Sequence, residues 1–284
     1  MTIPEIRIQD TINLPVLGIG TWEMGGRSTP DTSEDKKWLH ALEFALQSGI
    51  THIDTAAIYG GGHAEKLVGE AIKPFKRNEL LITTKVSGNQ LQFEDVLRSA
   101  KASLKRLNTD YIDLFLLHWP NASVPLSQTM SAINKLMDDA IIRHFGVSNF
   151  PVQLMQEIKF YTDAPIITNQ IEYNLFTRNS GAHNQAMETE IIPYCQKNGI
   201  SITAWRPMMK GHDHAPTHPL LLALAEKYGK TPFQIGLNWL VNKPLMLAIP
   251  KMSSEEHILQ NIEALQFQME AEDLEALQAI DTSK

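Results

Sequence analysis

The chain is poor in cysteine, since Cys195 is the only one in 284 residues. No disulfide can form within it, which suits a reducing cytosol. Cys195 stands in IIPYCQKNGI, a helical pattern that approaches Gly199, and this position favours a buried structural thiol over a catalytic nucleophile. We therefore expect a cytoplasmic protein in which the thiol serves packing.

Clusters of basic residues and long apolar runs are also lacking. The formal net charge is -7, and Lys101, Lys105 and Arg106 fit the outer face of one helix, so nucleic acid is not an expected partner. No apolar run reaches about 18 residues, which argues against a membrane span. The opening MTIPEIRIQD has neither the basic nor the apolar region of a signal peptide.

What the chain does contain is a regular alternation of strand and helix patterns. An apolar–polar alternation around a turn at residues 10–13 predicts a β-hairpin that runs into a strand at 16–20. Seven more strands are expected at 51–54, 80–86, 111–119, 143–148, 166–173, 201–207 and 246–250. Helices are expected at 33–48, 64–75, 93–108, 126–139, 151–160, 188–198, 220–228, 232–241, 255–264 and 271–279.

This order predicts the fold class α/β, as a (β/α)8 TIM barrel with an N-terminal β-hairpin cap. Eight strands are each followed by a helix, and apolar strands such as DLFLLH indicate a parallel sheet covered on both faces. A doubly wound open sheet is the alternative, but no GxGxxG follows the first strand. No linker divides the chain, so residues 1–284 are expected to form a single barrel domain.

Polar and aromatic residues stand where each apolar strand pattern stops. In such a barrel the catalytic groups gather at the carboxyl ends of the strands. Read in chain order, these ends carry Gly20, Thr21 and Trp22, then Asp54 with Tyr59 on its loop, then Lys85, His118 and Trp119, Ser148 and Asn149, Gln170, Trp205, and Lys251. The sequence therefore predicts one site assembled from several strands.

Four of these residues form a plausible acid–base group. Lys85 would ion-pair with Asp54, and its ammonium would lower the pKa of the Tyr59 hydroxyl. Tyr59 could then exchange a proton with a carbonyl oxygen to which His118 also hydrogen-bonds. Taken singly, the aspartate could cap a loop, the lysine could be an edge charge and the histidine could lie in the core. Their joint placement at successive strand ends favours catalysis.

The sequence resembles the aldo-keto reductase family along essentially its whole length. The matching motifs are GITHIDTAAIYGGGHAE (49–65), LLITTKV (80–86), LKRLNTDYIDLFLLHWP (104–120), GVSNF (146–150), NQIEYN (169–174), AWRPM (204–208) and IPK (249–251). The form is similar to the bacterial branch that includes methylglyoxal and 2,5-diketogluconate reductases. The resemblance implies an NADPH-dependent oxidoreductase that reduces aldehydes, ketones or small dicarbonyls without a metal.

The resemblance also assigns roles to residues. It places the family's catalytic tetrad at Asp54, Tyr59, Lys85 and His118, with Tyr59 as the general acid. It implies that Ser148, Asn149 and Gln170 hold the nicotinamide carboxamide and that Trp205 stacks on the ring. The full set of expected cofactor contacts is Thr21, Trp22, Ser148, Asn149, Gln170, Trp205, Arg206, Pro207, Met208, Lys251, Met252, Ser253, His257, Gln260 and Asn261. Arg206 departs from the family pattern, and either adds charge near the phosphates or projects into solvent.

The adenosine end departs further from the family pattern K-S-x-x-x-x-R-x-x-E-N. Lys251 and Asn261 match, whereas Met252, His257 and Gln260 replace serine, arginine and glutamate. A histidine that is mostly neutral at pH 7 cannot make the bidentate contact of a guanidinium. NADPH is therefore the expected cofactor, with weaker discrimination against NADH than a complete motif would give.

The substrate pocket is expected between Trp22 and Trp119, beside Tyr59, with Met24 and Phe150 as further candidates. A loop with His212, His214 and His218 could hold zinc, but a place near the cofactor is favoured over a metal site.

Two rival functions are a reductase-like sensor of NADP(H) and a barrel lyase or isomerase. The resemblance further suggests a monomer.

Overall fold

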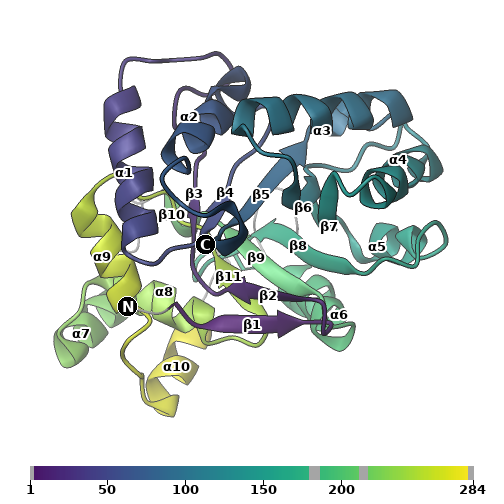
Figure 1. The fold of residues 1–284 in the computed structure, drawn as a ribbon. Coiled ribbons are helices and arrows are strands. Elements are labelled where there is room, and N and C mark those ends of the chain that lie inside the picture. The colour runs from purple at the N-terminus through teal and green to yellow at the C-terminus, as the bar shows by residue number, and fades with distance from the viewer. Residues whose placement is uncertain (1–2, 179–185, 211–216, 281–284) are drawn as a thin grey trace.

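The computed structural model describes residues 3–178, 186–210 and 217–280, and it is a closed barrel of parallel strands (Figure 1). In order around the barrel the eight strands are β3 (Gly18–Gly20), β4 (His52–Asp54), β5 (Leu81–Val86), β6 (Ile112–Leu117), β7 (Ile142–Ser148), β8 (Ile166–Glu172), β9 (Ser201–Trp205) and β11 (Met246–Ala248). Leu17 pairs with Ala248 and closes the ring. The (β/α)8 barrel is therefore confirmed, and the open sheet is wrong.

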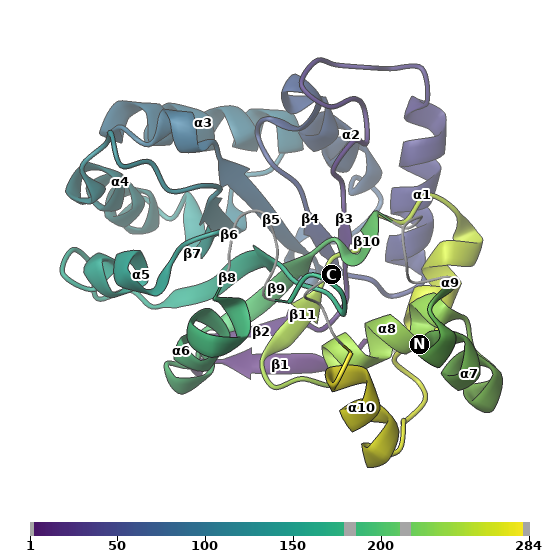
Figure 2. The same cartoon turned by 180° about the vertical axis from the view of Figure 1, so that it is seen from behind.

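Helices surround this sheet, as Figure 1 and the opposite view in Figure 2 show. They are α1 (Asp35–Gln47), α2 (His63–Ala71), α3 (Phe93–Leu107), α4 (Leu126–Asp138), α5 (Val152–Ile158), α6 (Ile192–Lys197), α7 (Pro219–Tyr228), α8 (Pro232–Val241), α9 (Glu255–Glu263) and α10 (Ala271–Gln278). Each contributes buried apolar residues to one extensive core, which includes Cys195. Burial raises the pKa of the Cys195 thiol to about 12, in keeping with a packing role.

Two helices begin differently from the sequence prediction. Asp31 accepts hydrogen bonds from the backbone N–H and the hydroxyl of Ser33, so this first residue of the helix expected at 33–48 belongs to a turn before α1. The helix expected at 188–198 is divided into a wide π turn, Met187–Ile191, and the α-helix α6. Pro193 lies in the first turn of α6, where its missing N–H costs no hydrogen bond.

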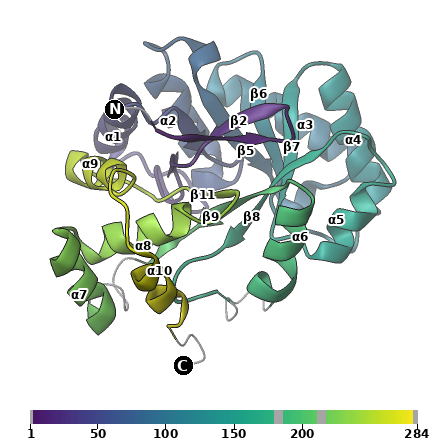
Figure 3. The same ribbon diagram turned by 90° about the horizontal axis from the view of Figure 1, so that it is seen from below.

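The amino-terminal end of the barrel is sealed by the antiparallel hairpin β1 (Glu5–Ile8) and β2 (Ile12–Pro15). Figure 3 shows both strands lying across the barrel. An apolar cluster fills this end: Ile8 and Leu14 from the hairpin pack on Leu81, Leu114, Leu116, Ile167 and Leu247 from the barrel. The predicted hairpin cap is confirmed, and it leaves the carboxyl ends of the strands open for a site. Among the described residues, no helix combines the length and apolar character needed to cross a bilayer.

Candidate active site

The centre of the site is a buried ion pair between the ends of β4 and β5. The Lys85 ammonium lies 2.6 Å from Asp54 Oδ1 and donates a second hydrogen bond, of 2.8 Å, to the Thr55 carbonyl. Lys85 has no exposed surface and Asp54 is 2% exposed. Burial would lower the pKa of Lys85, but the Asp54 carboxylate and the Tyr59 phenol outweigh it and raise that pKa above 10.5. Lys85 is therefore charged at neutral pH.

Tyr59 reaches this cation from a tight turn, Tyr59–Gly62, that precedes α2. The Lys85 ammonium donates a 3.3 Å hydrogen bond to the Tyr59 hydroxyl. Gly60 and Gly61 have φ of 55° and 60°, and a Cβ on Gly60 would come within 2.3 Å of the Gly25 carbonyl oxygen. Only glycine accepts this combination of left-handed backbone and close approach, so the glycines are what aim the phenol inward.

The sequence predicts that Lys85 lowers the pKa of the Tyr59 hydroxyl, but the net shift has the opposite direction. Burial raises the pKa of the phenol above its ordinary value of 10, and this effect outweighs the neighbouring Lys85 charge, which acts in the expected, lowering direction. The Asp54 carboxylate adds to the increase because it disfavours a second anion nearby. Tyr59 therefore holds its proton throughout the neutral range, as a proton donor must.

His118 follows β6 and faces Tyr59, with ring centroids 5.7 Å apart and planes inclined by 69°. Burial and the Lys85 charge lower its pKa to about 3, so the imidazole is neutral at pH 7. Tyr59 and His118 are each 8% exposed, whereas Lys85 is wholly enclosed. The two groups able to hydrogen-bond a substrate therefore keep a small exposed surface, and the charge that supports them has none.

The β3 end borders the same site. The Thr21 backbone N–H donates to the Asp54 carbonyl at 2.9 Å. Trp22 meets Tyr59 edge to face, with centroids 4.9 Å apart, and is 38% exposed. Trp119 lies close to Gly88, where a Cβ would approach the Trp119 carbonyl oxygen to 2.9 Å. The structure thus places Trp22 at an accessible position directly beside the phenol, and Trp119 in the loop that follows His118.

The ends of β7 and β8 contribute amide and hydroxyl groups. Gln170 donates a 2.7 Å hydrogen bond to Asp54 Oδ2, so the carboxylate is bound on both oxygens. The Ser148 hydroxyl donates to the Gln170 carbonyl, and the Asn149 amide donates to Ser148 Oγ and to the His118 carbonyl. The contact between Gln170 and Asp54 was not predicted, because nothing in the local sequence signals a pair 116 residues apart.

Trp205, at the end of β9, donates its indole N–H to Asn149 Oδ1 at 3.2 Å. Arg206 has φ of 49°; its guanidinium lies over the Trp205 ring at 5.1 Å and 3.4 Å from Glu172. It therefore has a defined place against the protein, and Glu172 partly neutralises it. Pro207 and Met208 open the short strand β10 (Pro207–Lys210), and Met208 packs against the core.

Beyond β11, Lys251 forms a 2.8 Å ion pair with Glu23 from the loop after β3. Met252 is wholly buried in the core, so its side chain is unable to touch a cofactor there. Ser253 is half-buried, and Ser254 caps α9 by accepting from the His257 backbone N–H. On the same helix, Gln260 bonds Glu256, and Asn261 is half-buried.

The histidine loop expected from the sequence is only partly described. His212 and His214 lie outside the described residues. His218 precedes α7 and lies 5.5 Å from the Phe176 ring, centroid to centroid. Within the described ranges no three His, Cys, Asp or Glu side chains form a group able to hold a metal ion.

Comparison with known proteins identifies the family. The model of the aldo/keto reductase family matches residues 16–282. Methylglyoxal reductase YeaE of Escherichia coli is 32% identical over 276 residues, which cover 96% of this chain and 93% of that enzyme. The solved structure of the thermostable aldo-keto reductase Tm1743, in complex with the inhibitor epalrestat, has a TM-score of 0.92 at 39% identity and covers 97% of this chain and 99% of its own.

An aldo/keto reductase from Klebsiella pneumoniae, solved with NADP and acetate, has a TM-score of 0.87 at 33% identity, with 96% of this chain and 93% of its own covered. The family model spans most of the chain, and the fold matches that of solved family members. The chain therefore belongs to the aldo/keto reductase family and is an oxidoreductase acting on carbonyl compounds.

Proposed function

We propose that this protein reduces aldehydes, ketones or small dicarbonyls to alcohols with NADPH, and that Tyr59 is the general acid. The observation that carries this proposal is the Tyr59 hydroxyl, 3.3 Å from a buried ammonium and facing a neutral imidazole at the open end of the barrel. Protonation of a carbonyl oxygen requires a proton donor, a cation that stabilises the donor's anion, and a neutral group that hydrogen-bonds the oxygen.

In this mechanism each residue has a separate task. Tyr59 transfers its hydroxyl proton to the substrate oxygen, and Lys85 stabilises the phenolate that remains. Asp54, held by Gln170 and Lys85, fixes the ammonium under the phenol. His118 orients the carbonyl oxygen by a hydrogen bond. When bound, the reduced nicotinamide supplies the hydride that the carbonyl carbon accepts.

The residues at the strand ends suit this cofactor. Ser148, Asn149 and Gln170 form a buried set of hydroxyl and amide groups of the kind that binds a carboxamide, and the Trp205 ring lies against it. Thr21 also has a buried hydroxyl without a hydrogen-bond partner in the described part of the chain. Lys251 supplies positive charge for the phosphates. The Klebsiella pneumoniae relative solved with NADP supports NADP(H) as the cofactor.

The substrate class follows from the access to Tyr59. Trp22 gives an aromatic wall beside the phenol, and the methylglyoxal reductase relative supports small dicarbonyls. The decisive measurement is the loss of NADPH absorbance with methylglyoxal, other dicarbonyls and aromatic aldehydes. We expect Tyr59→Phe to lower kcat by about a hundredfold or more while NADPH still binds, because only the acid is removed. Unchanged NADPH oxidation by this variant would contradict the mechanism and favour a role as a sensor.

Several sequence-based expectations stay predictions: a single domain over residues 1–284, a monomer and a cytoplasmic location. A lyase or isomerase is disfavoured by the family assignment.

A further inference from the structure

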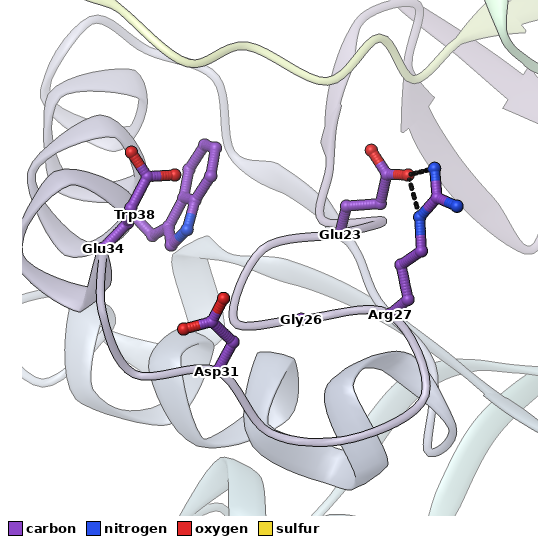
Figure 4. A pocket seen from close by; sticks show the side chains of 6 residues that line it. All are labelled: Glu23, Gly26, Arg27, Asp31, Glu34 and Trp38. Atoms are coloured by element: carbon purple, nitrogen blue, oxygen red, sulfur yellow. Dashed lines mark hydrogen bonds and ion pairs between the residues drawn. The ribbon is translucent and has the colours of Figure 1, made fainter.

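Glu23 joins two cations at the edge where the loops after β3 and β11 meet. Its Oε2 atom accepts a 2.8 Å hydrogen bond from the Lys251 ammonium. Its Oε1 atom accepts from Arg27, with Nε at 2.7 Å and the terminal nitrogen at 2.6 Å, as the dashed lines of Figure 4 show. Both carboxylate oxygens are therefore engaged, one on each cation.

The backbone under Glu23 is conformationally costly. Its φ is 68°, in the left-handed region that favours glycine, and the turn is closed by a bridge between Glu23 and Gly26. The neighbouring backbone fixes the loop, since the Gly20 N–H donates to the Pro250 carbonyl at 3.0 Å. The side chain is thus held against Lys251 by the closing strands of the barrel.

The surroundings of this ion pair are mainly acidic. Glu23 lines a hollow of about 360 Å³ with its partner Arg27, with Asp31 and Glu34, and with the indole of Trp38 (Figure 4). The first turn of α9, three residues after Met252, adds Glu255 and Glu256. Glu23 therefore neutralises Lys251 directly.

A 2′-phosphate and a 2′-hydroxyl would meet this pair differently. A phosphate dianion that approaches Lys251 must displace the Glu23 carboxylate or lie beside it, and like charges repel. A ribose hydroxyl can instead donate a hydrogen bond to a carboxylate, as in NAD-binding sites. Glu23 thus disfavours the 2′-phosphate of NADPH and can hydrogen-bond the 2′-hydroxyl of NADH.

Building on the proposed function, we propose that Glu23 determines cofactor specificity by competing with the 2′-phosphate of NADPH for Lys251, and so reduces the preference for NADPH over NADH. The Glu23 carboxylate and the 2′-phosphate compete for the Lys251 ammonium. Arg27 binds the other oxygen of the carboxylate. Removing the carboxylate frees Lys251 for the phosphate without touching Tyr59, Lys85 or His118.

The test measures equilibrium binding of NADPH, NADH and 2′,5′-ADP by quenching of tryptophan fluorescence and by calorimetry. Glu23→Gln removes the charge, and Glu23→Gly does so while relieving the left-handed backbone. We expect both variants to bind NADPH and 2′,5′-ADP roughly two to five times more tightly, the range of a partly exposed ion pair. Their affinity for NADH should stay the same or fall. Added salt should reduce the gain, because it screens the charges involved.

Glu34→Gln is the matched control. It removes one negative charge from the same hollow, but Glu34 pairs with Lys37 and is not a partner of Lys251. Its ratio of NADPH to NADH affinity should equal that of the unaltered protein. If the ratio of NADPH to NADH affinity stayed the same in both Glu23 variants, or changed equally in Glu34→Gln, the role proposed for Glu23 would be wrong. The proposed function would not be affected by that result. If the unaltered protein bound neither dinucleotide, the proposed function would fail as well.

Discussion

Lys85 is the residue that connects the charged parts of the site. It has no exposed surface, and its ammonium contacts the Asp54 carboxylate, the Thr55 carbonyl and the Tyr59 hydroxyl. A buried cation of this kind is stable only when its hydrogen bonds are satisfied and an anion is present. Asp54 supplies the anion and is itself fixed by Gln170. The pair therefore holds a positive charge under the phenol while leaving the phenol protonated.

The raised pKa of Tyr59 predicts the pH dependence of the reaction. A general acid is active below its pKa, so carbonyl reduction should not vary with Tyr59 ionisation from about pH 6 to about pH 9, and should decline only as the pH passes above 10. His118, with a pKa of about 3, should add no transition near pH 6.5. The measurement is kcat/KM for an aldehyde over this range. A transition between pH 7 and 8 that disappears in Tyr59→Phe would show that the Lys85 charge outweighs burial.

Residue identities were easier to predict than residue partners. Asp54, Lys85 and His118 were found because each stands where an apolar strand stops, and parallel barrel strands bring those ends together. No sequence pattern predicts the role of Glu23, because that role depends on an ion pair with Lys251, which is 228 positions away in the sequence. The net direction of the Tyr59 pKa shift is not predictable from sequence either, since it depends on how deeply the folded chain buries the phenol.

Among the elements, the glycine turn before α2 controls where the phenol points. The Gly60 N–H donates to the Arg27 carbonyl at 2.8 Å, which ties the turn to the loop after β3. Gly62 also has a positive φ, and a Cβ there would meet the Arg106 side chain at 2.7 Å. The turn is therefore enclosed by the β3 loop on one side and by α3 on the other.

Gly60→Ala and Gly61→Ala form a matched pair of tests for this turn. Both residues have similar positive φ, but the nearest contact of the added Cβ would be 2.3 Å, to the Gly25 carbonyl oxygen, at Gly60 and 3.3 Å, to Pro30 and the Ser28 carbonyl oxygen, at Gly61. Gly61→Ala should cost about 1–2 kcal/mol of unfolding free energy and leave kcat nearly unchanged. Gly60→Ala should cost more and lower kcat by about tenfold or more, because Tyr59 must shift. Chemical denaturation and steady-state rates check both. Equal effects on kcat would contradict the role assigned to the close approach.

Helices α2 and α3 are joined to β5 through a buried carboxylate. Glu65 has no exposed surface; it accepts from the Thr84 hydroxyl at 2.6 Å and from Arg106 Nε at 2.6 Å. Arg106 is 22% exposed at its side chain. This basic residue, expected on the outer face of its helix, therefore also reaches inward to neutralise a buried charge.

Arg106→Met should destabilise the protein by about 3–5 kcal/mol, because it leaves the Glu65 carboxylate buried without a counter-charge. The double variant Glu65→Gln with Arg106→Met should regain part of that loss, since no charge remains to be buried. Urea unfolding of the two single variants and the double variant gives the coupling. Strictly additive losses would show that the two side chains do not stabilise each other.

For the molecule as a whole, the barrel interior changes character from one end to the other. The hairpin end is apolar, with Ile8 and Leu14 inside it. The next layer is polar: His52 bonds the Thr83 hydroxyl at 3.0 Å, and the hydroxyls of Thr168 and Thr203 are 2.8 Å apart. Above this layer lies the charged site. This order places the buried pair of Lys85 and Asp54 at the carboxyl end of the barrel strands, where a substrate can approach.

The strand and helix order of this barrel was predictable because it depends on local periodicity, and most ends agree within two residues. The polar layer was not, because the inward side of a strand such as His52–Asp54 is decided by its neighbours. Gly18 illustrates this, since a Cβ there would come within 2.8 Å of the His52 ring. A small residue on one strand thus makes room for a large one on the next.

Two buried histidines predict how the whole molecule responds to acid. Burial lowers the pKa of His52 to about 4 and that of His118 to about 3, against 6.5 in the unfolded chain. Below pH 6.5 these two histidines therefore bind protons in the unfolded chain but not in the folded protein. The free energy of unfolding should fall as the pH drops from about 6 toward 4, by about 1.4 kcal/mol per pH unit for each histidine.

His52→Gln isolates one of these contributions. Glutamine can retain a polar contact with Thr83 but does not titrate, so the variant should lose stability less steeply than the unaltered protein below about pH 6. The slope should decrease by about 1.4 kcal/mol per pH unit, the contribution of a single proton. Urea unfolding at several values between about pH 4.5 and 8 measures it, and the difference between the two proteins cancels the carboxylates they share. Parallel slopes would mean that folded His52 takes up a proton in this range, which its enclosed position in the barrel opposes.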